Sequence, residues 1–208
     1  MRRKVGTLFM LLGAALIIGA LSLFLMNQHE DRMAGESSQE MLFQIQQEIA
    51  RNQQRGPTEP NLLDNIPVEM LDPEDLVMTE RIINGYPCIG YISIPDLLLQ
   101  LPVITDWNGK KLQTAPCRFS GTLRGEDLVI MAHSYDSHFG RLHTLTEGSE
   151  IQFTDMDGNV WNYEVAVMDV LDAYAVEEMT AGEYDLTLFT CTTDHHHRVT
   201  VRCNRIEQ

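Results

Sequence analysis

Cysteine is scarce in this sequence, and its four cysteines form no CxxC pair. Paired CxxC motifs are typical of zinc ribbons and thioredoxin-like redox sites, so both of these classes are excluded. The spacings do not resemble a disulfide framework, and a chain of 208 residues can bury a core without crosslinks. A disulfide among Cys88, Cys117 and Cys203 is left open, because sequence alone does not pair thiols.

Basic residues are also few, with 15 lysines and arginines against 30 aspartates and glutamates. Three of them, Arg2, Arg3 and Lys4, precede every acidic residue, so the remainder of the chain carries a formal charge of about −18. A surface of this sign repels phosphate backbones, which makes nucleic acid an unsuitable partner. It also disfavours docking of the soluble part on anionic lipid.

Charged residues are missing altogether between Lys4 and Glu30, and residues 5–26 are apolar throughout. A helix rising about 1.5 Å per residue would cross a hydrocarbon core of about 30 Å over that length. The basic residues before it predict a cytoplasmic tail over 1–4, a transmembrane signal-anchor over 5–26 and an extracellular remainder. A cleaved signal peptide is the alternative, but its apolar region is usually about 7–15 residues long and ends at a small-x-small site.

Residues 27–80 are expected to form an extracellular spacer. Within it, 38–51 shows the apolar spacing of a helix that packs on the catalytic domain or stands alone as a stalk. Residues 55–60, with the sequence RGPTEP, should break this helix. The acidic stretch that follows, from 61 to 80, is expected to be irregular.

From residue 81 to 208 the sequence changes to short apolar runs separated by turn residues. The expected strands are 86–94, 97–104, 127–133, 151–154, 160–170, 186–191 and 198–206. Asp157-Gly158-Asn159 is a hairpin signal between two of them. Many strands with little helix predict a closed barrel or a sandwich, so the fold class is mainly β.

Three residues in this region could carry chemistry. In the strand 186–191 alternate side chains face opposite sides, so Cys191 points outward if Leu186 and Leu188 face the core. His133 follows another strand and could act as the base that a thiol nucleophile needs. Arg198 begins the last strand, beside Cys191 if the two strands form a hairpin, where it could stabilise an oxyanion. Each residue alone has a simpler interpretation: a buried thiol, a surface histidine and a solvated arginine.

Several linked motifs resemble those of sortases. Thr187-Leu188-Phe189-Thr190-Cys191 resembles the TLxTC signature, and 195–201 resembles the closing strand, whose arginine falls at Arg198. Residues 127–133 resemble the histidine strand, 138–142 the phenylalanine/leucine segment after it, and 90–95 the opening strand. The motifs follow the family order and span about residues 85–206, so chance agreement is improbable.

The resemblance implies an eight-stranded sortase-type β-barrel over 81–208 with short helices. It implies a cysteine transpeptidase with Cys191 as nucleophile, His133 as general acid/base and Arg198 as substrate and oxyanion ligand, without a cofactor. Thr190 is expected to add a supporting hydroxyl to substrate binding. The implied partners are exported proteins with an LPxTG-like sorting signal and an amine of a peptidoglycan precursor or pilin. The implied location is the outer face of a Gram-positive-type cell membrane.

Some alternatives stay open. A hydrolase of the same fold would release its product to water, and an anchored binding protein would not need the three residues together. His195, His196 and His197 could bind zinc or copper with Cys191, but successive residues on a strand face opposite sides, so no metal is expected. Ser134 stands where many relatives carry Asn or Arg; the long spacer and short closing loop favour a class B-like enzyme.

Overall fold

The computed structural model describes residues 2–54, 76–192, 194 and 196–206. Its helices are α1 (Arg2–Gln54), α2 (Gly109–Leu112) and α3 (Val176–Met179), with 3-10 turns at Pro95–Leu97 and Leu142–Thr144. Its strands are β1 (Arg81–Ile83), β2 (Tyr86–Ile94), β3 (Leu99–Ile104), β4 (Cys117–Ser120), β5 (Leu128–Met131), β6 (Glu150–Asp155), β7 (Val160–Asp172), β8 (Leu186–Cys191) and β9 (His197–Arg205). The predicted helix break at 55–60 and most of the predicted irregular stretch 61–80 lie outside the described residues.

Eight of these strands close into a barrel, as the sequence predicted. The sheet runs in the order β1-β2-β3-β4-β5-β8-β9-β7-β6, and a further pairing of β2 with β6 joins its ends. β1 pairs only with β2 and so extends the sheet outside the closed ring. Closure depends on Gly90, which has a φ of 146° and lies so close to β6 that a Cβ atom there would be 2.1 Å from the carbonyl oxygen of Thr154. Only glycine combines that backbone with that approach.

Each of the seven strands predicted from the sequence overlaps an observed strand, and 86–94 and 186–191 match to the residue. The sequence did not predict β1 and β4, which have three and four residues. Neither is long enough to show the alternation of apolar and polar residues by which strands are recognised. In β4 only Cys117 is fully buried.

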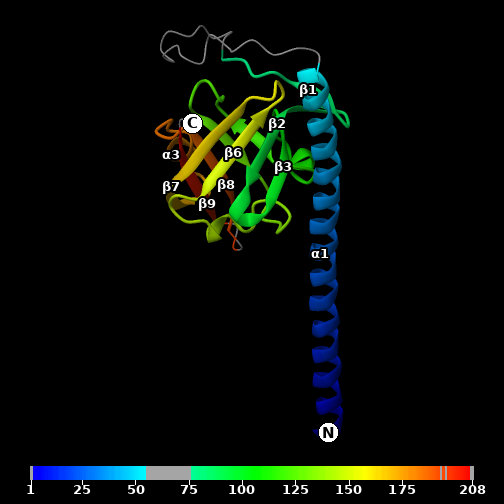
Figure 1. Ribbon diagram of the computed structural model, residues 1–208. Helices are drawn as coiled ribbons and strands as arrows, with labels where there is room; N and C mark the ends of the chain where they lie inside the picture. Colours follow the sequence, from blue (N-terminus) through cyan, green and yellow to red (C-terminus); the bar gives the residue numbers. More distant parts are fainter. Residues whose placement is uncertain (1, 55–75, 193, 195, 207–208) are drawn as a thin grey trace.

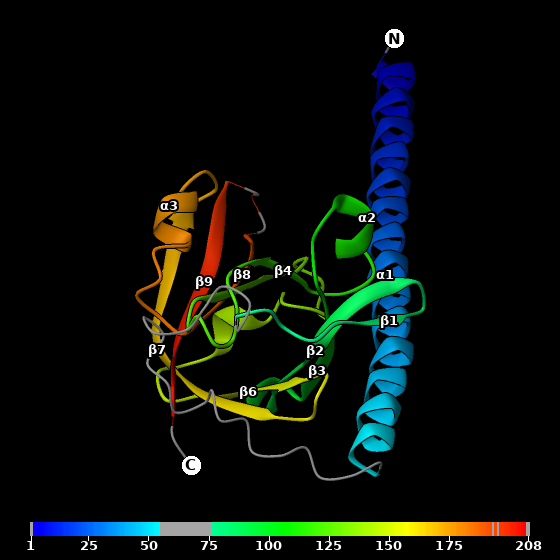
Figure 2. The ribbon, with the colours of Figure 1, turned by 90° about the horizontal axis from the view of Figure 1, so that it is seen from above.

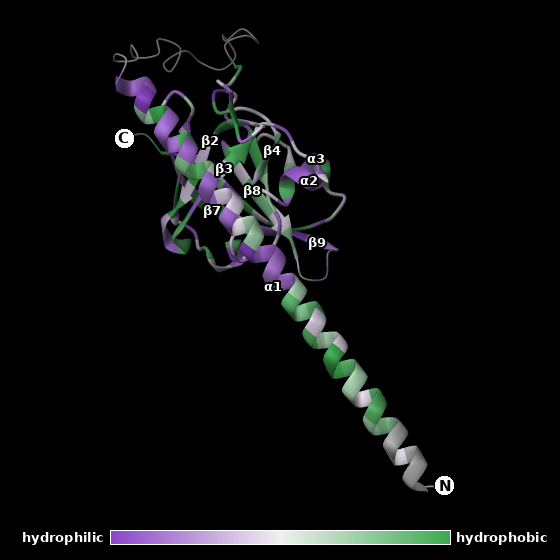
Figure 3. Cartoon of the chain, turned by 90° about the vertical axis from the view of Figure 1, so that its right-hand side faces the viewer, coloured by the Kyte–Doolittle hydropathy of each residue, from purple (hydrophilic) through white to green (hydrophobic). Residues whose placement is uncertain are grey.

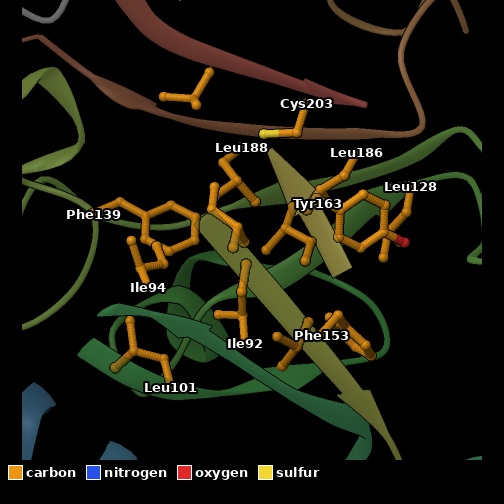
Figure 4. Close-up of a cluster of buried hydrophobic side chains, with 14 of the residues drawn as sticks. Ile92, Ile94, Leu101, Leu128, Phe139, Phe153, Tyr163, Leu186, Leu188 and Cys203 are labelled. Atoms are coloured by element: carbon orange, nitrogen blue, oxygen red, sulfur yellow. The ribbon is translucent and has the colours of Figure 1, made fainter. Parts of the chain in front are cut away.

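The barrel interior holds the main hydrophobic core (Figure 4). Aromatic side chains fill much of it, and Phe139, Phe153 and Tyr163 are almost completely buried. Leu186 and Leu188 of β8 point into this core, and so does Cys203 of β9. Burial of these side chains determines which face of β8 and β9 points into the barrel. The alternate residues of both strands must therefore point to the outer surface.

A second hydrophobic cluster lies between α1 and the outside of the barrel. Figures 1 and 2 show the second half of α1 running along one side of the barrel, near β1 and β3. The helix contributes Met41, Ile45 and Ile49, which are four residues apart and so fall on one face of a helix with 3.6 residues per turn, as predicted. We call this side of the barrel the covered wall; its barrel residues are Ile83, Cys88, Ile104, Leu112, Ala115, Cys117 and Met156.

The helix was predicted to begin at Ser38, but it extends without a break from Arg2 to Gln54. Residues 27–37 contain no proline and are mostly good helix formers, so the polar stretch continues the apolar one. In the first half the apolar side chains are exposed, for example Leu16 and Phe24. Figure 3 shows this half of α1 coloured mostly as hydrophobic, in contrast to the second half. Among the described residues this is the one helix long and apolar enough to cross a membrane.

Candidate active site

Cys191 ends β8 on the outer surface of the barrel. Its neighbours Leu188 and Leu186 belong to the core, whereas Phe189 belongs to a separate cluster on the outside. Cys191 is partly exposed, while Cys88, Cys117 and Cys203 are buried and all four are free thiols. The alternation of β8 therefore places Cys191 on the outside of the barrel, where it is the one partly exposed sulfur among the four cysteines.

Arg198 lies directly opposite Cys191. Strands β8 and β9 form an antiparallel pair in which Cys191 is the register partner of Arg198. Opposite residues in such a pair have Cβ atoms about 4.5–5.5 Å apart and project from the same face. Val199 and Val201 pack toward the core, so Arg198 faces outward, as the sequence predicted. One guanidinium nitrogen donates to the carbonyl of His197 at 3.0 Å.

His133 reaches the same place from β5. That strand runs parallel to β8 with Met131 beside Phe189, and two residues further along each chain are His133 and Cys191. The pairing continues past β5, since the backbone nitrogen of Ala132 donates to the Phe189 carbonyl at 3.2 Å. Neighbouring strands lie about 4.8 Å apart. The strand register thus brings together all three predicted residues, Cys191 and Arg198 from consecutive strands and His133 from the end of β5, much earlier in the sequence.

Thr190 lies on the opposite face of β8 from Cys191 and is buried, with 3% of its surface exposed. Its hydroxyl donates to the carbonyl of Ala132 at 2.8 Å. This hydrogen bond ties the end of β5 to the end of β8. The predicted contact of Thr190 with a substrate stays a prediction.

An apolar surface surrounds Cys191 on the outside of the barrel. Phe189 packs edge-on against Phe119 at 5.4 Å between ring centroids, and Phe119 stacks on Trp107 at 5.8 Å. Val129 and Met179 complete this cluster, with Met131 and Leu171 packed against it. We call this side of the barrel the open wall, because α3 covers only part of it and Cys191 and Trp107 stay accessible.

A sequence model of the family described as "Sortase domain" matches residues 92–206, more than half of the chain. The chain belongs to the sortase family. A comparison with curated proteins finds no match. As a member of this family it is a cysteine transpeptidase of the sorting kind, and the predicted sortase-type barrel is confirmed.

Solved sortases share this fold. Sortase C1 from Streptococcus suis is 28% identical with a TM-score of 0.53, and the match covers 58% of this chain and 74% of that one. Sortase A from Corynebacterium diphtheriae is 22% identical with a TM-score of 0.54, over 90% and 96% of the chains. A Clostridium perfringens Sortase D5 transpeptidase is 21% identical with a TM-score of 0.53, over 61% and 83%.

These relatives bear the names of classes A, C and D, so the shared barrel does not separate the classes. The last two are similar at the level of the fold alone. The class B-like assignment stays a prediction.

Sequence reasoning missed how the loop after His133 is held. We call residues 133–140 the His133 loop. Its ends meet where the backbone nitrogen of Phe139 donates to the His133 carbonyl at 3.2 Å. The ring of Tyr135 lies against that of His133, with centroids 4.9 Å apart, and against that of His138, at 5.6 Å. No motif in the sequence signals these contacts.

His138, which the sequence analysis placed only within the phenylalanine/leucine segment, is fully buried in this sortase. Burial, followed by the nearby charge of His133, lowers the pKa of His138 to about 4, so its ring is neutral at physiological pH. Ser38 donates its hydroxyl hydrogen to the Thr114 carbonyl, which leaves its oxygen to accept from Nε2 of His138 at 3.0 Å. The histidine thereby links the loop to α1.

The histidine run offers little to a metal. His195 lies outside the described residues, His196 is exposed and the ring of His197 is 3.4 Å from the Asp194 carboxylate. Hydrogen bonds from the Thr192 hydroxyl and the His196 backbone lower the pKa of Asp194 to about 2. Within the described part of the chain, no three His, Cys, Asp or Glu residues are grouped to hold a metal ion.

Proposed function

We propose that this sortase is anchored in the membrane by residues 5–26 and acts outside the cell. It cleaves an LPxTG-like sorting signal of exported proteins and transfers the product to an amine of a cell-wall precursor or pilin. Cys191 is the nucleophile, His133 the general acid/base and Arg198 the oxyanion ligand. Residues 1–4 form the cytoplasmic tail, 27–80 the extracellular spacer and 81–208 the catalytic domain.

The observation that carries this proposal is the register of three strands. The parallel alignment of β5 with β8 and the antiparallel alignment of β8 with β9 support a thiol, an imidazole and a guanidinium side by side on the open wall. A non-enzymatic binding surface has no need of that combination.

The chemistry follows from the three groups. His133 and Arg198 favour the thiolate of Cys191, which attacks the scissile carbonyl while Arg198 donates hydrogen bonds to the developing oxyanion. His133 gives a proton to the departing amine, so the C–N bond breaks and a thioester remains. The incoming amine then loses a proton to His133, attacks the thioester and expels the thiolate. One amide is broken and one is formed, and no cofactor is consumed.

The open wall supports binding of the signal, since Trp107 stays about half-exposed there and stacks on Phe119. The position of the site relative to α1 supports action at a membrane. The His133 loop contacts Asp31, five residues after the apolar run ends at Met26. At about 1.5 Å per residue, the site would lie within roughly 10 Å of the membrane surface.

The test is a peptide-library cleavage assay with the full-length protein in detergent, with and without an added amine, read by mass spectrometry. We expect cleavage within one motif class and an amine-linked product when the amine is present. Water-derived product alone, at every amine concentration, would identify a hydrolase. The Cys191→Ala variant is the control, and the trapped thioester should appear as a mass increase on the wild-type chain only.

A further inference from the structure

We propose that Asp31, Gly35 and Ser38 of α1 form a clamp that positions His133 for catalysis. This inference rests on the proposed role of His133, and it makes the helix that follows the membrane anchor a part of the active-site architecture. We call these three residues the α1 clamp. The clamp residues touch the His133 loop and lie across it from the substrate, so they act as positioning residues.

The strongest contact joins Asp31 to Ser137. The backbone nitrogen of Ser137 donates to the Asp31 carboxylate at 3.0 Å, and the Ser137 hydroxyl donates to the Asp31 backbone carbonyl at 3.0 Å and to its carboxylate. Both the main chain and the side chain of the loop are therefore bound to one residue of the helix. Hydrogen bonds to a charged group are the stronger kind.

Helix and loop approach each other very closely at Gly35. A Cβ atom at this position would lie 3.0 Å from Cβ of Ser137 and 3.5 Å from its hydroxyl. A glycine in the middle of a long helix costs about 1 kcal/mol of helix stability relative to alanine. The close approach gives a reason for this glycine, since a larger side chain would push the loop outward.

Ser38 holds the loop at a second point through His138, one helical turn beyond Gly35. Its oxygen lies 3.0 Å from Nε2 of His138, and both side chains are fully buried. The ring of Tyr135 lies between His133 and the two residues that are bound to α1, Ser137 and His138. It contacts the imidazoles of His133 and His138. Burial and the carboxylates of Glu30 and Asp31 raise the pKa of Tyr135, so its hydroxyl stays protonated against the helix.

Within the described residues, the loop is also held by its own turn, in which the backbone nitrogens of His138 and Gly140 donate to the Tyr135 carbonyl at 3.0 and 2.9 Å. Phe139 anchors its far end in the core, and its backbone closes onto the His133 carbonyl. Residues 134–138 between these points carry their side-chain hydrogen bonds to α1. A displacement of about 1 Å at a catalytic group can cost a hundredfold in rate. Loosening the clamp should therefore slow the chemical step while the open wall is unchanged.

The experiment measures kcat and KM for a sorting-signal peptide with full-length protein in detergent, together with the thermal unfolding midpoint. Asp31→Ala removes the carboxylate and should lower kcat by about 10- to 100-fold with KM changed less than about threefold. Asp31→Asn keeps an oxygen that accepts from Ser137 and should retain kcat within about threefold. Glu36→Ala is the matched control, since Glu36 is exposed on the same helix and, within the described residues, pairs with Arg32 and makes no hydrogen bond to the His133 loop.

A second variant tests the same idea without removing a hydrogen bond. Gly35→Leu should raise helix propensity yet lower kcat at least tenfold, because its side chain displaces Ser137. In the wild-type protein and Glu36→Ala, the nuclear magnetic resonance signals of the His133 ring should coincide; in Asp31→Ala and Gly35→Leu they should shift.

The clamp is overturned if Asp31→Ala keeps the kcat of the wild-type protein. It is also overturned if Glu36→Ala lowers kcat as much as Asp31→Ala does. If KM of Asp31→Ala rises by the same factor by which kcat falls, and its unfolding midpoint is lowered, the contact only stabilises the fold. That result would also reject the clamp. His133→Ala in the same assay separates this inference from the proposed function. Turnover by His133→Ala would remove both, whereas an inactive His133→Ala beside an active Asp31→Ala would remove the clamp alone.

Discussion

The covered wall and the open wall of this barrel place the same residue types in opposite environments. Under α1, burial raises the pKa of Cys88 and Cys117 to about 12, and His138 is kept neutral. On the open wall Cys191 stays partly exposed, with Arg198 opposite it and His133 alongside. A cysteine or histidine in this protein is therefore enclosed where α1 or the barrel core buries it, as the core does for Cys203, and accessible on the open wall.

The largest effect should come from removing the available thiol. Cys191→Ala should abolish cleavage of a sorting-signal peptide, with at least about a thousandfold loss, because no other accessible sulfur can form the thioester. Circular dichroism and the unfolding midpoint should be unchanged, since Cys191 is not part of either core. Measurable turnover by this variant would show that the open wall does not carry the nucleophile.

Arg198→Lys should be the next most damaging change. Lysine keeps the positive charge but lacks the planar donor fork, so we expect a loss of about a hundredfold in kcat/KM. Steady-state kinetics on the same peptide measures it. The matched control is Arg81→Lys, an exposed arginine on β1, which should leave kcat/KM unchanged. Near-normal turnover by Arg198→Lys would reject a role that depends on the fork.

Alkylation should separate the thiols of the two walls directly. At pH 8 the native protein should take up one equivalent of iodoacetamide, at Cys191, because the thiolate is the reactive form and the pKa of Cys88 and Cys117 is near 12. The rate ratio should be at least about a hundredfold, read by peptide mass spectrometry. Modification of Cys88 or Cys117 at a comparable rate in folded protein would mean that α1 does not seal the covered wall.

A smaller effect is expected on the pH dependence of stability. The pKa of His138 is lowered from about 6.5 to about 4 on folding, so the folded state prefers the neutral ring. The associated stability is complete above pH 6.5 and is lost as the pH falls toward 4, by up to about 1.4 kcal/mol per pH unit. His138→Gln, which can still donate to Ser38, should flatten this slope in denaturant unfolding from pH 7 to 5. Equal slopes would place His138 in contact with solvent.

The smallest effect should follow from trimming a buried thiol. Cys117→Ala should lower the free energy of unfolding by about 1 kcal/mol, since it removes one sulfur from a packed cluster. Cleavage activity should stay within about twofold of wild type. A loss of activity similar to that of Cys191→Ala would contradict the distinction between the walls.

Much of the barrel could be predicted from local patterns. The alternation in 186–191 fixed which side chains of β8 face inward, and the same rule gave the outward direction of Arg198. The apolar face of 38–51 predicted a packed helix. The helix actually begins at Arg2, because no residue in 27–37 interrupts it. The short strands β1 and β4 could not be predicted, because three or four residues carry no period.

The sequence by itself determined the apolar segment at 5–26, the acidic remainder, the mainly β composition and the family motifs around His133, Cys191 and Arg198. Only the tertiary structure decided which strands are neighbours, and therefore that β5 and β8 run in parallel with His133 beside Cys191. It also decided that the Thr190 hydroxyl donates to the Ala132 carbonyl and that His138 is buried against Ser38. Periodicity is a property of a few consecutive residues, whereas contacts between residues 100 positions apart, such as Ser38 and His138, depend on how the whole barrel closes against α1.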